Sequence, residues 1–163
     1  MQKKKSLRLL ITEECNFNCS YCCNKMPEVR RCFRYKKLND INFREYDSIC
    51  ITGGEPFKYL GRMSYVFWKA ADFIQYQYLY TNGSLINRSN FKILRWFDGV
   101  SVGVHDELPV DQIQFLTALK NVRFLIDREK VGRYRDIIPQ DRIKLYTLND
   151  CNLTDREDWV VLK

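Results

Sequence analysis

Three cysteines in one short segment are the residues of this sequence best suited to chemistry. Cys15, Cys19 and Cys22 have the spacing C-x3-C-x2-C and follow directly after an apolar run. Thiolates are soft ligands that suit iron–sulfur clusters, zinc and Cu(I). A loop with three thiolates can hold three irons of a [4Fe–4S] cube and leave the fourth iron open. An open coordination position is typical of a catalytic metal site.

The other candidate metal ligands are scattered along the chain. Structural zinc usually has four ligands, often supplied by two separated C-x2-C pairs, and no second pair follows here. The remaining thiols are Cys23, Cys32, Cys50 and Cys151, and His105 is the single histidine. We expect Cys23 to lie beside the metal site without binding it, and Cys50 to pack inside a strand. The other two cysteines are predicted to be free thiols.

Two glycine-containing turns follow the next two strand-like runs. Gly53-Gly54-Glu55-Pro56 comes after SICIT, and TNG at 81–83 comes after YQYLYT. Asn-Gly is by itself a common turn signal, and GGEP alone would also read as an ordinary turn. Behind a cysteine motif, at the ends of successive strand-like runs, the two turns indicate one shared site.

Together these motifs resemble the radical S-adenosylmethionine (radical SAM) enzymes. The resemblance is carried by C-x3-C-x2-C after the first strand, with the aromatic Tyr21 just before its last cysteine, by GGEP after the second strand and by TNG after the third. The alternation of strand and helix patterns extends it over roughly residues 7–148.

The resemblance implies a cofactor pair and a reaction. Cys15, Cys19 and Cys22 would bind a [4Fe–4S] cluster whose open iron holds the amino and carboxylate groups of SAM, and Tyr21 would pack near the adenine. An electron from a donor such as flavodoxin or ferredoxin would cleave the S–C5′ bond of SAM. The products would be methionine and a 5′-deoxyadenosyl radical that abstracts hydrogen from a substrate. In such reactions the cofactor performs the difficult chemistry while the protein positions the substrate.

The resemblance also implies further SAM contacts. Gly53 and Gly54 would let the backbone approach the methionine amino group, since glycine has no Cβ. Glu55 would support that turn or balance its charge, and Pro56 would fix the exit of the turn. The expected contacts to ribose or carboxylate are Asn82, Ser101 and His105.

The elements that must position these residues alternate along the chain. Short runs rich in β-branched or aromatic residues predict strands at 7–12, 48–52, 76–81, 99–104, 122–126 and 142–148. Helical patterns capped by Ser64, Ser89 and Asp111 lie between them, while 24–46 reads as irregular. Such alternation predicts a parallel α/β sheet, either open and doubly wound or curved into a partial (βα)6 barrel, as the resemblance implies. In both, the site lies at the carboxyl ends of the strands.

The charge of the chain suggests an anionic partner. The net charge is +7, and residues 25–37 hold six basic residues and one acidic residue. Arg30, Arg31 and Lys36 are therefore predicted to bind an anionic substrate, although such a segment can also be a solvated loop. An alternative function from another class is a non-catalytic, zinc-stabilised nucleic-acid-binding module.

The length and hydropathy of the chain set further expectations. No apolar run is long enough to span a bilayer, and the basic start lacks a signal-peptide pattern, so we expect a cytoplasmic protein. Residues 1–163 are predicted to form one radical SAM core domain, with 149–163 as a tail that is a short helix or covers a sheet edge. Little chain remains to close the pocket. We therefore expect a large substrate, such as a protein or nucleic acid, or else a lid from a partner chain or an oligomer. A nucleotide, or a small acid or nucleoside-like molecule, is an alternative substrate.

Overall fold

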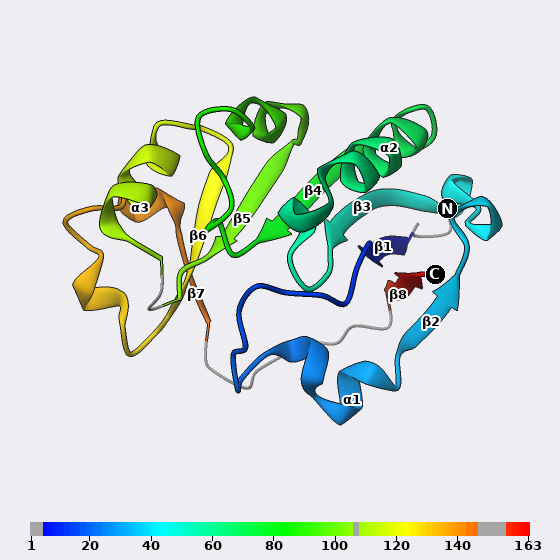
Figure 1. Cartoon of the computed structure of the whole chain (residues 1–163), viewed down its shortest axis with the longest axis horizontal. Coiled ribbons are helices and arrows are strands. Elements are labelled where there is room, and N and C mark those ends of the chain that lie inside the picture. The colour runs from blue at the N-terminus through cyan, green and yellow to red at the C-terminus, as the bar shows by residue number, and fades with distance from the viewer. Residues whose placement is uncertain (1–4, 106–107, 147–155) are drawn as a thin grey trace.

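Eight strands pair side by side, all in parallel, in one sheet. A computed structural model describes residues 5–105, 108–146 and 156–163. Among these residues the strands are β1 (Lys5–Leu10), β2 (Phe33–Lys36), β3 (Tyr46–Thr52), β4 (Tyr76–Thr81), β5 (Gly99–Gly103), β6 (Val122–Asp127), β7 (Ile143–Tyr146) and β8 (Glu157–Leu162). Their order across the sheet is β2-β8-β1-β3-β4-β5-β6-β7 (Figure 1). The prediction of a parallel α/β sheet is confirmed, and all six predicted strands are present.

Two strands go beyond the six that the sequence predicts. Residues Glu157–Leu162 of the predicted tail form β8, which pairs with β1 and with β2 and so lies inside the sheet, while residues 149–155 lie outside the described residues. The segment read as irregular contains β2, which pairs with β8 and forms the edge of the sheet. Strand β2 (FRYK) is short and lacks the apolar run of a strand buried on both faces.

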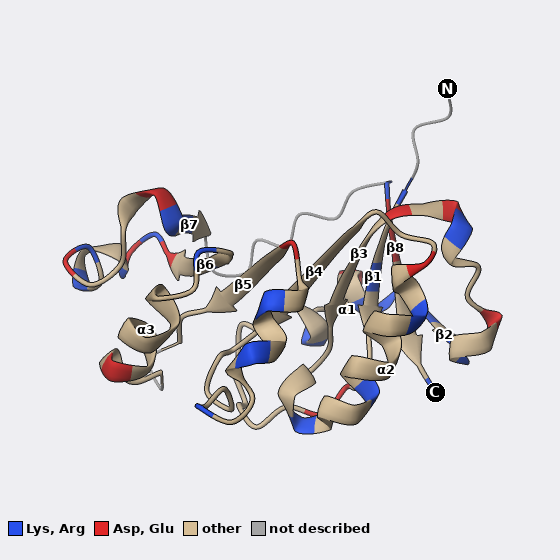
Figure 2. Cartoon of the chain, turned by 90° about the horizontal axis from the view of Figure 1, so that it is seen from above, with Lys and Arg blue, Asp and Glu red and all other residues tan. Residues whose placement is uncertain are grey.

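The longer helices cover one face of the sheet. Helices α2 (Leu60–Ala71) and α3 (Val110–Thr117) lie on the same side, as Figure 2 shows. The buried residues of α2 are Met63, Val66, Phe67 and Ala70, and those of α3 are Ile113 and Leu116; all belong to the main apolar core. This core also contains alternate strand residues such as Leu7, Leu9, Phe124 and Ile126. The helix-covered face therefore holds most of the apolar burial that stabilises the domain.

The short helix α1 (Pro27–Arg30) packs differently. Its Val29 belongs to a smaller buried cluster with Leu10, Trp159 and Val161. Leu10 is two residues after Arg8 in β1, so this cluster lies on the face opposite the main core. Helix α1 thus closes one end of the face that α2 and α3 leave uncovered.

The predicted helix starts require correction. Ser64 lies inside α2, because the 3₁₀ helix η4 (Pro56–Tyr59) leads into it and the Glu55 side chain caps η4. The segment after Ser89 forms a 3₁₀ helix, η5 (Phe91–Trp96), and α3 begins one residue before Asp111. None of the helices in the described ranges combines the length and apolar character needed to cross a membrane.

Candidate active site

The cysteine loop after β1 lies directly against the GGEP turn after β3. The Gly54 amide donates to the Thr12 carbonyl at 2.8 Å, and the Glu55 amide donates to the Glu14 carbonyl at 2.8 Å. These two bonds continue the β1–β3 pairing beyond the ends of both strands. The cysteine loop therefore starts from a fixed position at the carboxyl edge of the sheet.

The two glycines of this turn are required by that close approach. A Cβ at Gly53 would lie 2.4 Å from the Thr12 carbonyl oxygen, and one at Gly54 would lie 2.0 Å from the Glu14 carbonyl oxygen. Gly53 also has a φ of +154°, which residues with a side chain rarely adopt. In this structure the missing side chains make room for the cysteine loop, a role that the sequence did not suggest.

Glu55 joins the two glycine-containing turns. Its side chain is fully buried and accepts hydrogen bonds from the Thr81 hydroxyl at 2.7 Å, the Asn82 amide at 2.8 Å and the Phe57 amide at 3.0 Å. Burial raises the pKa of Glu55, while the three donors act in the opposite direction by stabilising its anion. Glu55 thus holds the turn after β3 against the turn after β4.

Asn82 connects the turn after β4 to the cysteine loop. Its side-chain amide donates to the Asn16 side-chain oxygen at 3.0 Å and lies 3.7 Å from the Cys15 sulfur. The Ser84 hydroxyl bridges the pair, since it donates to Asn82 and accepts from Asn16. The Phe17 amide also donates to the Cys15 sulfur at 3.3 Å. Two N–H donors thus lie beside the Cys15 sulfur, and thiolate sulfur is the form in which cysteine binds metal.

The three motif cysteines lie on this loop and form no disulfide among the described residues. Cys15 is exposed, Cys19 and Cys22 are half-buried, and burial raises the pKa of the Cys22 thiol. A single tetrahedral zinc would hold its sulfurs within about 4 Å of one another. Within the described ranges, no three His, Cys, Asp or Glu residues are gathered to hold one metal ion. The donor set itself, three thiols with amide donors at Cys15, fits a thiolate-ligated iron–sulfur cluster.

Two polar residues that sequence reasoning missed, Asn24 and Lys25, form hydrogen bonds that fix the cysteine loop. The Asn24 side chain donates to the Gly53 carbonyl at 2.7 Å. The Lys25 ammonium donates to the Cys19 carbonyl at 2.9 Å and to the Asn18 side chain at 2.6 Å. The sequence signal that could have pointed to Asn24 and Lys25 is their position directly after the cysteine motif. Lys25, which the sequence placed in an anion-binding segment, instead stabilises the cysteine loop.

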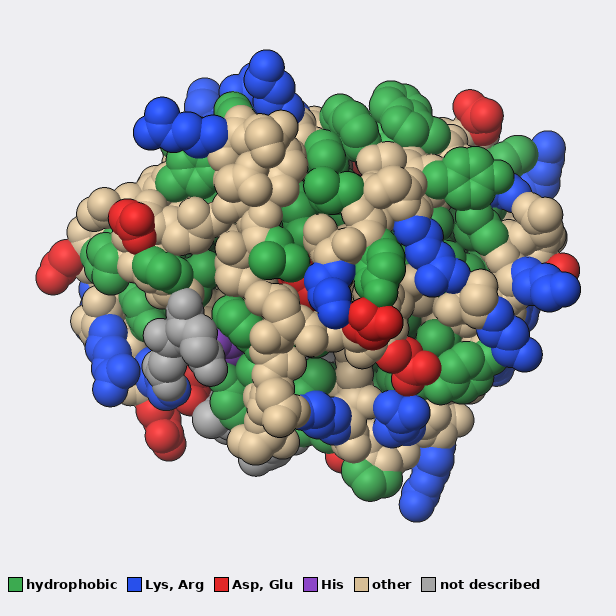
Figure 3. Space-filling model, viewed as in Figure 1, with side chains coloured by type: hydrophobic (Ala, Val, Ile, Leu, Met, Phe, Trp, Pro, Cys, Tyr) green, Lys and Arg blue, Asp and Glu red, His purple; other side chains and the backbone are tan. Residues whose placement is uncertain are grey.

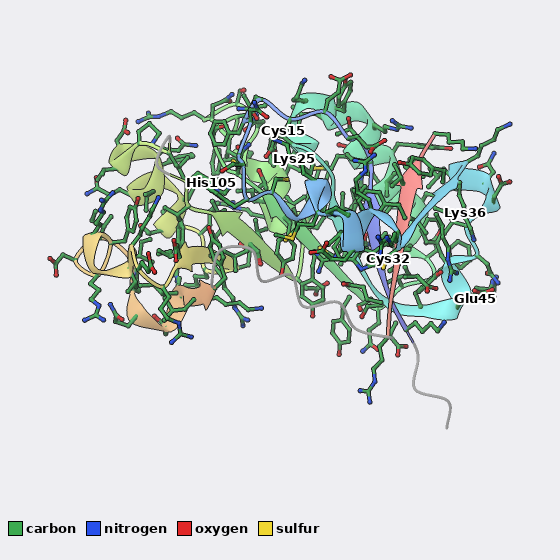
Figure 4. The ribbon with its side chains drawn as sticks, turned by 90° about the horizontal axis from the view of Figure 1, so that it is seen from below. Cys15, Lys25, Cys32, Lys36, Glu45 and His105 are labelled. Carbon is green, nitrogen blue, oxygen red and sulfur yellow. The ribbon has the colours of Figure 1, made fainter. Side chains whose placement is uncertain are left out.

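Tyr21 and His105, two further predicted site residues, contact each other beside the cysteine loop. The Tyr21 hydroxyl and the His105 Nδ1 form a hydrogen bond at 2.9 Å, and Phe17 makes an edge contact with the same imidazole. The imidazole lies close over Gly103, where a Cβ would be 3.1 Å from Nε2. Figure 4 shows His105, Cys15 and Lys25 on the same part of the molecule. Tyr21 and His105 therefore form one unit at the carboxyl edge of the sheet.

Ser101 lies elsewhere, on the sheet face that α2 and α3 leave uncovered. A pocket of about 240 Å³ opens on this face. It is lined by Ser6, Arg8, Ser48, Cys50, Tyr78, Tyr80, Ser101, Arg123, Lys144 and Glu157. We call it the inner-face pocket. Burial raises the pKa of Cys50 to about 12, so this thiol remains protonated at neutral pH.

The basic segment 25–37 is partly neutralised. Arg30 lies 3.3 Å from Glu13, and Arg34 lies 4.0 Å from Asp158. Figure 3 shows basic side chains over the region of α1 and β2 with acidic side chains beside them. Of the predicted substrate-binding residues Arg30, Arg31 and Lys36, the first is thus engaged with Glu13, while Lys36 lies at the end of edge strand β2.

Comparisons with known proteins find a similar fold in solved structures that include SuiB of Streptococcus suis. No protein-family model matches the chain, and no curated protein matches it in sequence. A structure of Streptococcus suis SuiB bound to S-adenosylmethionine matches 97% of this chain and 47% of SuiB, with 12% identity and a TM-score of 0.61. SuiB bound to precursor peptide SuiA matches 89% of this chain and 39% of SuiB, with 16% identity and a TM-score of 0.62. The chain thus spans less than half the length of these SuiB chains.

The likeness establishes the fold. SuiB is a radical SAM enzyme, and at 12% to 16% identity the likeness to it shows the fold alone. The predicted partial barrel of parallel strands is confirmed. The structure adds that the cysteine loop, the GGEP turn and the TNG turn are joined by hydrogen bonds at one edge of this fold.

Proposed function

We propose that this chain is a radical SAM enzyme that acts on a peptide. The observation that carries the proposal is the attachment of the three-cysteine loop to both glycine-containing turns. Cys15, Cys19 and Cys22 would hold a [4Fe–4S] cluster. When bound, the cluster and SAM would supply the reducing electron and a 5′-deoxyadenosyl radical. A cytoplasmic flavodoxin or ferredoxin would be the electron donor.

The residues of the chain have separate roles in this proposal. Glu55 fixes the distance between the two turns, and Asn82 directs an amide toward the Cys15 sulfur. The Gly53 carbonyl, which already accepts from the Asn24 side chain, would also accept from the ammonium group of SAM. Tyr21 and His105 form a paired wall for the adenosyl group.

The choice of a peptide substrate is supported by the structural neighbour and by the uncovered face of the sheet. SuiB has been crystallised with its precursor peptide. Helices α2 and α3 cover one face of the sheet and leave the other face open. A peptide laid along the uncovered face, or a partner chain, would exclude water from the reaction.

The test is SAM cleavage under anaerobic conditions. Protein reconstituted with iron and sulfide is mixed with SAM and dithionite, and 5′-deoxyadenosine is measured by chromatography. Cys19→Ser should abolish the product, whereas Cys32→Ser should not, because Cys32 is an exposed thiol outside the loop. A four-iron cluster without 5′-deoxyadenosine in the unsubstituted protein would contradict the proposal. Tightly held zinc with salt-sensitive nucleic-acid binding would support the binding-module alternative.

A further inference from the structure

The inner-face pocket carries an uneven distribution of charge. Arg8, Arg123, Lys144 and Glu157 are its charged lining residues. Arg8 and Glu157 lie 3.1 Å apart, and the Arg8 guanidinium is also stacked over the rings of Tyr80 and Trp159. The charge of Arg8 is therefore balanced by Glu157, while its buried Nε has no hydrogen-bond partner among the described residues.

The opposite end of the pocket holds two cations, Arg123 and Lys144. Arg123 lies in β6 and Lys144 in the adjacent edge strand β7, and Arg123 is the cross-strand neighbour of Ser101. Both side chains are exposed, and the described residues include no ion-pair partner for either. Parallel pairing of Lys144 with Leu125 directs Lys144 to the same face as Arg123.

The lining between these two ends is suited to a polar group with a carbon chain. Tyr78, Tyr80 and Ser101 contribute hydroxyl groups, and Cys50 contributes a protonated thiol. A volume of about 240 Å³ is below the roughly 300–1,000 Å³ that is usual for whole drug-sized ligands. The pocket therefore fits one side chain of a larger molecule better than a complete nucleotide.

We propose that Arg123 and Lys144 bind an acidic side chain, a carboxylate or a phosphate, of the peptide substrate. A guanidinium offers a planar pair of donors to either group, and the ammonium adds a second positive charge. This inference rests on the proposed function, because it places the recognised side chain on the face where the peptide would lie. It assigns anion recognition to the inner face rather than to the basic segment 25–37, where Arg30 and Arg34 already have acidic neighbours.

The test measures binding without turnover. Reconstituted protein with SAM, but without reductant, is equilibrated with pools of blocked pentapeptides whose flanking positions are randomised among neutral residues. The central residue is glutamate, phosphoserine, glutamine or serine, and the bound fraction is measured by mass spectrometry. We expect one acidic pool to bind about tenfold tighter than its neutral counterpart, a preference that weakens with added salt. The pool that shows it tells whether the recognised group is a carboxylate or a phosphate.

The variants decide the outcome. The double substitution Arg123→Gln and Lys144→Gln should remove the preference, whereas Lys92→Gln, an exposed cation on η5 of the helix-covered face, should keep it. Equal binding of acidic and neutral pools would overturn the inference, as would a preference that survives the double substitution. Loss of SAM retention with an unchanged peptide preference would also overturn it, since the two cations would then serve SAM. Failure of the proposed function would instead appear in the separate 5′-deoxyadenosine assay.

Discussion

The two faces of the sheet come from alternating residues of the same strands, yet they have opposite character. In β6, Phe124 is fully buried in the main core, while Arg123 is exposed on the other face. In β1, Leu7 and Leu9 are fully buried, while Arg8 lies between them and faces the inner-face pocket. The helix-covered face thus supplies stability, and the inner face is free to carry polar groups for binding. This division separates substitutions that affect folding from those that affect recognition.

The difference between the two faces of the sheet is tested most strongly by substitutions at two neighbouring residues of β6. Phe124→Ala should lower the free energy of unfolding by about 3–5 kcal/mol, because it removes a fully buried ring from the core. Arg123→Ala should change it by less than about 0.5 kcal/mol, as is usual for exposed positions. Urea unfolding under reducing conditions measures both. Similar losses for the two variants would show that the two faces do not divide stability and binding.

The carboxyl edge of the sheet, where the two turns meet, should be nearly as sensitive. Gly54→Ala places a Cβ against the Glu14 carbonyl, so we expect a loss of about 3 kcal/mol together with poor iron incorporation. Gly61→Ala is the matched control, because no atom lies within 4 Å of its Cβ position in α2. The control should be neutral or stabilising by up to about 1 kcal/mol. Full iron loading of Gly54→Ala would argue against this close approach.

The strands were largely predictable, because β3 to β7 are apolar runs bounded by turn residues. Strand β8 was not, since its apolar residues follow Glu157 and Asp158, and its partner β1 is far away in sequence. The start of α2 was also missed. The Glu55 side chain, rather than Ser64, provides the cap that leads into it.

The site was predictable only where a motif exists. The cysteines, GGEP and TNG follow fixed patterns, and the structure brings all three together. Asn24 and Lys25 could not be found, because their contacts depend on the path of the loop rather than on residue spacing. Whether the predicted residues bind SAM stays a prediction.

A smaller effect is expected at Glu55, with a characteristic pH dependence. Glu55→Gln keeps the shape of the side chain but directs an amide group at one of three donors, which should cost about 1–3 kcal/mol. Folding raises the pKa of Glu55 above its ordinary value of 4.5, so its contribution is fully present below that value. The contribution is lost as the pH rises through the folded pKa.

The difference in unfolding free energy between wild type and Glu55→Gln should therefore be larger at pH 4 than at pH 7. Urea unfolding at several pH values measures this difference. The contributions of the other acidic groups cancel in it, because both proteins share those groups. A difference that grows toward neutral pH would mean that the three donors outweigh burial and lower the pKa of Glu55.

The smallest effect is expected at the Tyr21–His105 pair. Tyr21→Phe removes one half-buried hydrogen bond, so unfolding should be easier by about 1 kcal/mol. Tyr65→Phe is the control, because Tyr65 is 61% exposed on α2 and should change stability by less than about 0.5 kcal/mol. If the pair also forms a wall for the adenosyl group, Tyr21→Phe should weaken SAM binding, measured by equilibrium dialysis, while Tyr65→Phe should not. Reduced stability with unchanged SAM affinity would restrict the pair to a structural role at the edge of the cysteine loop.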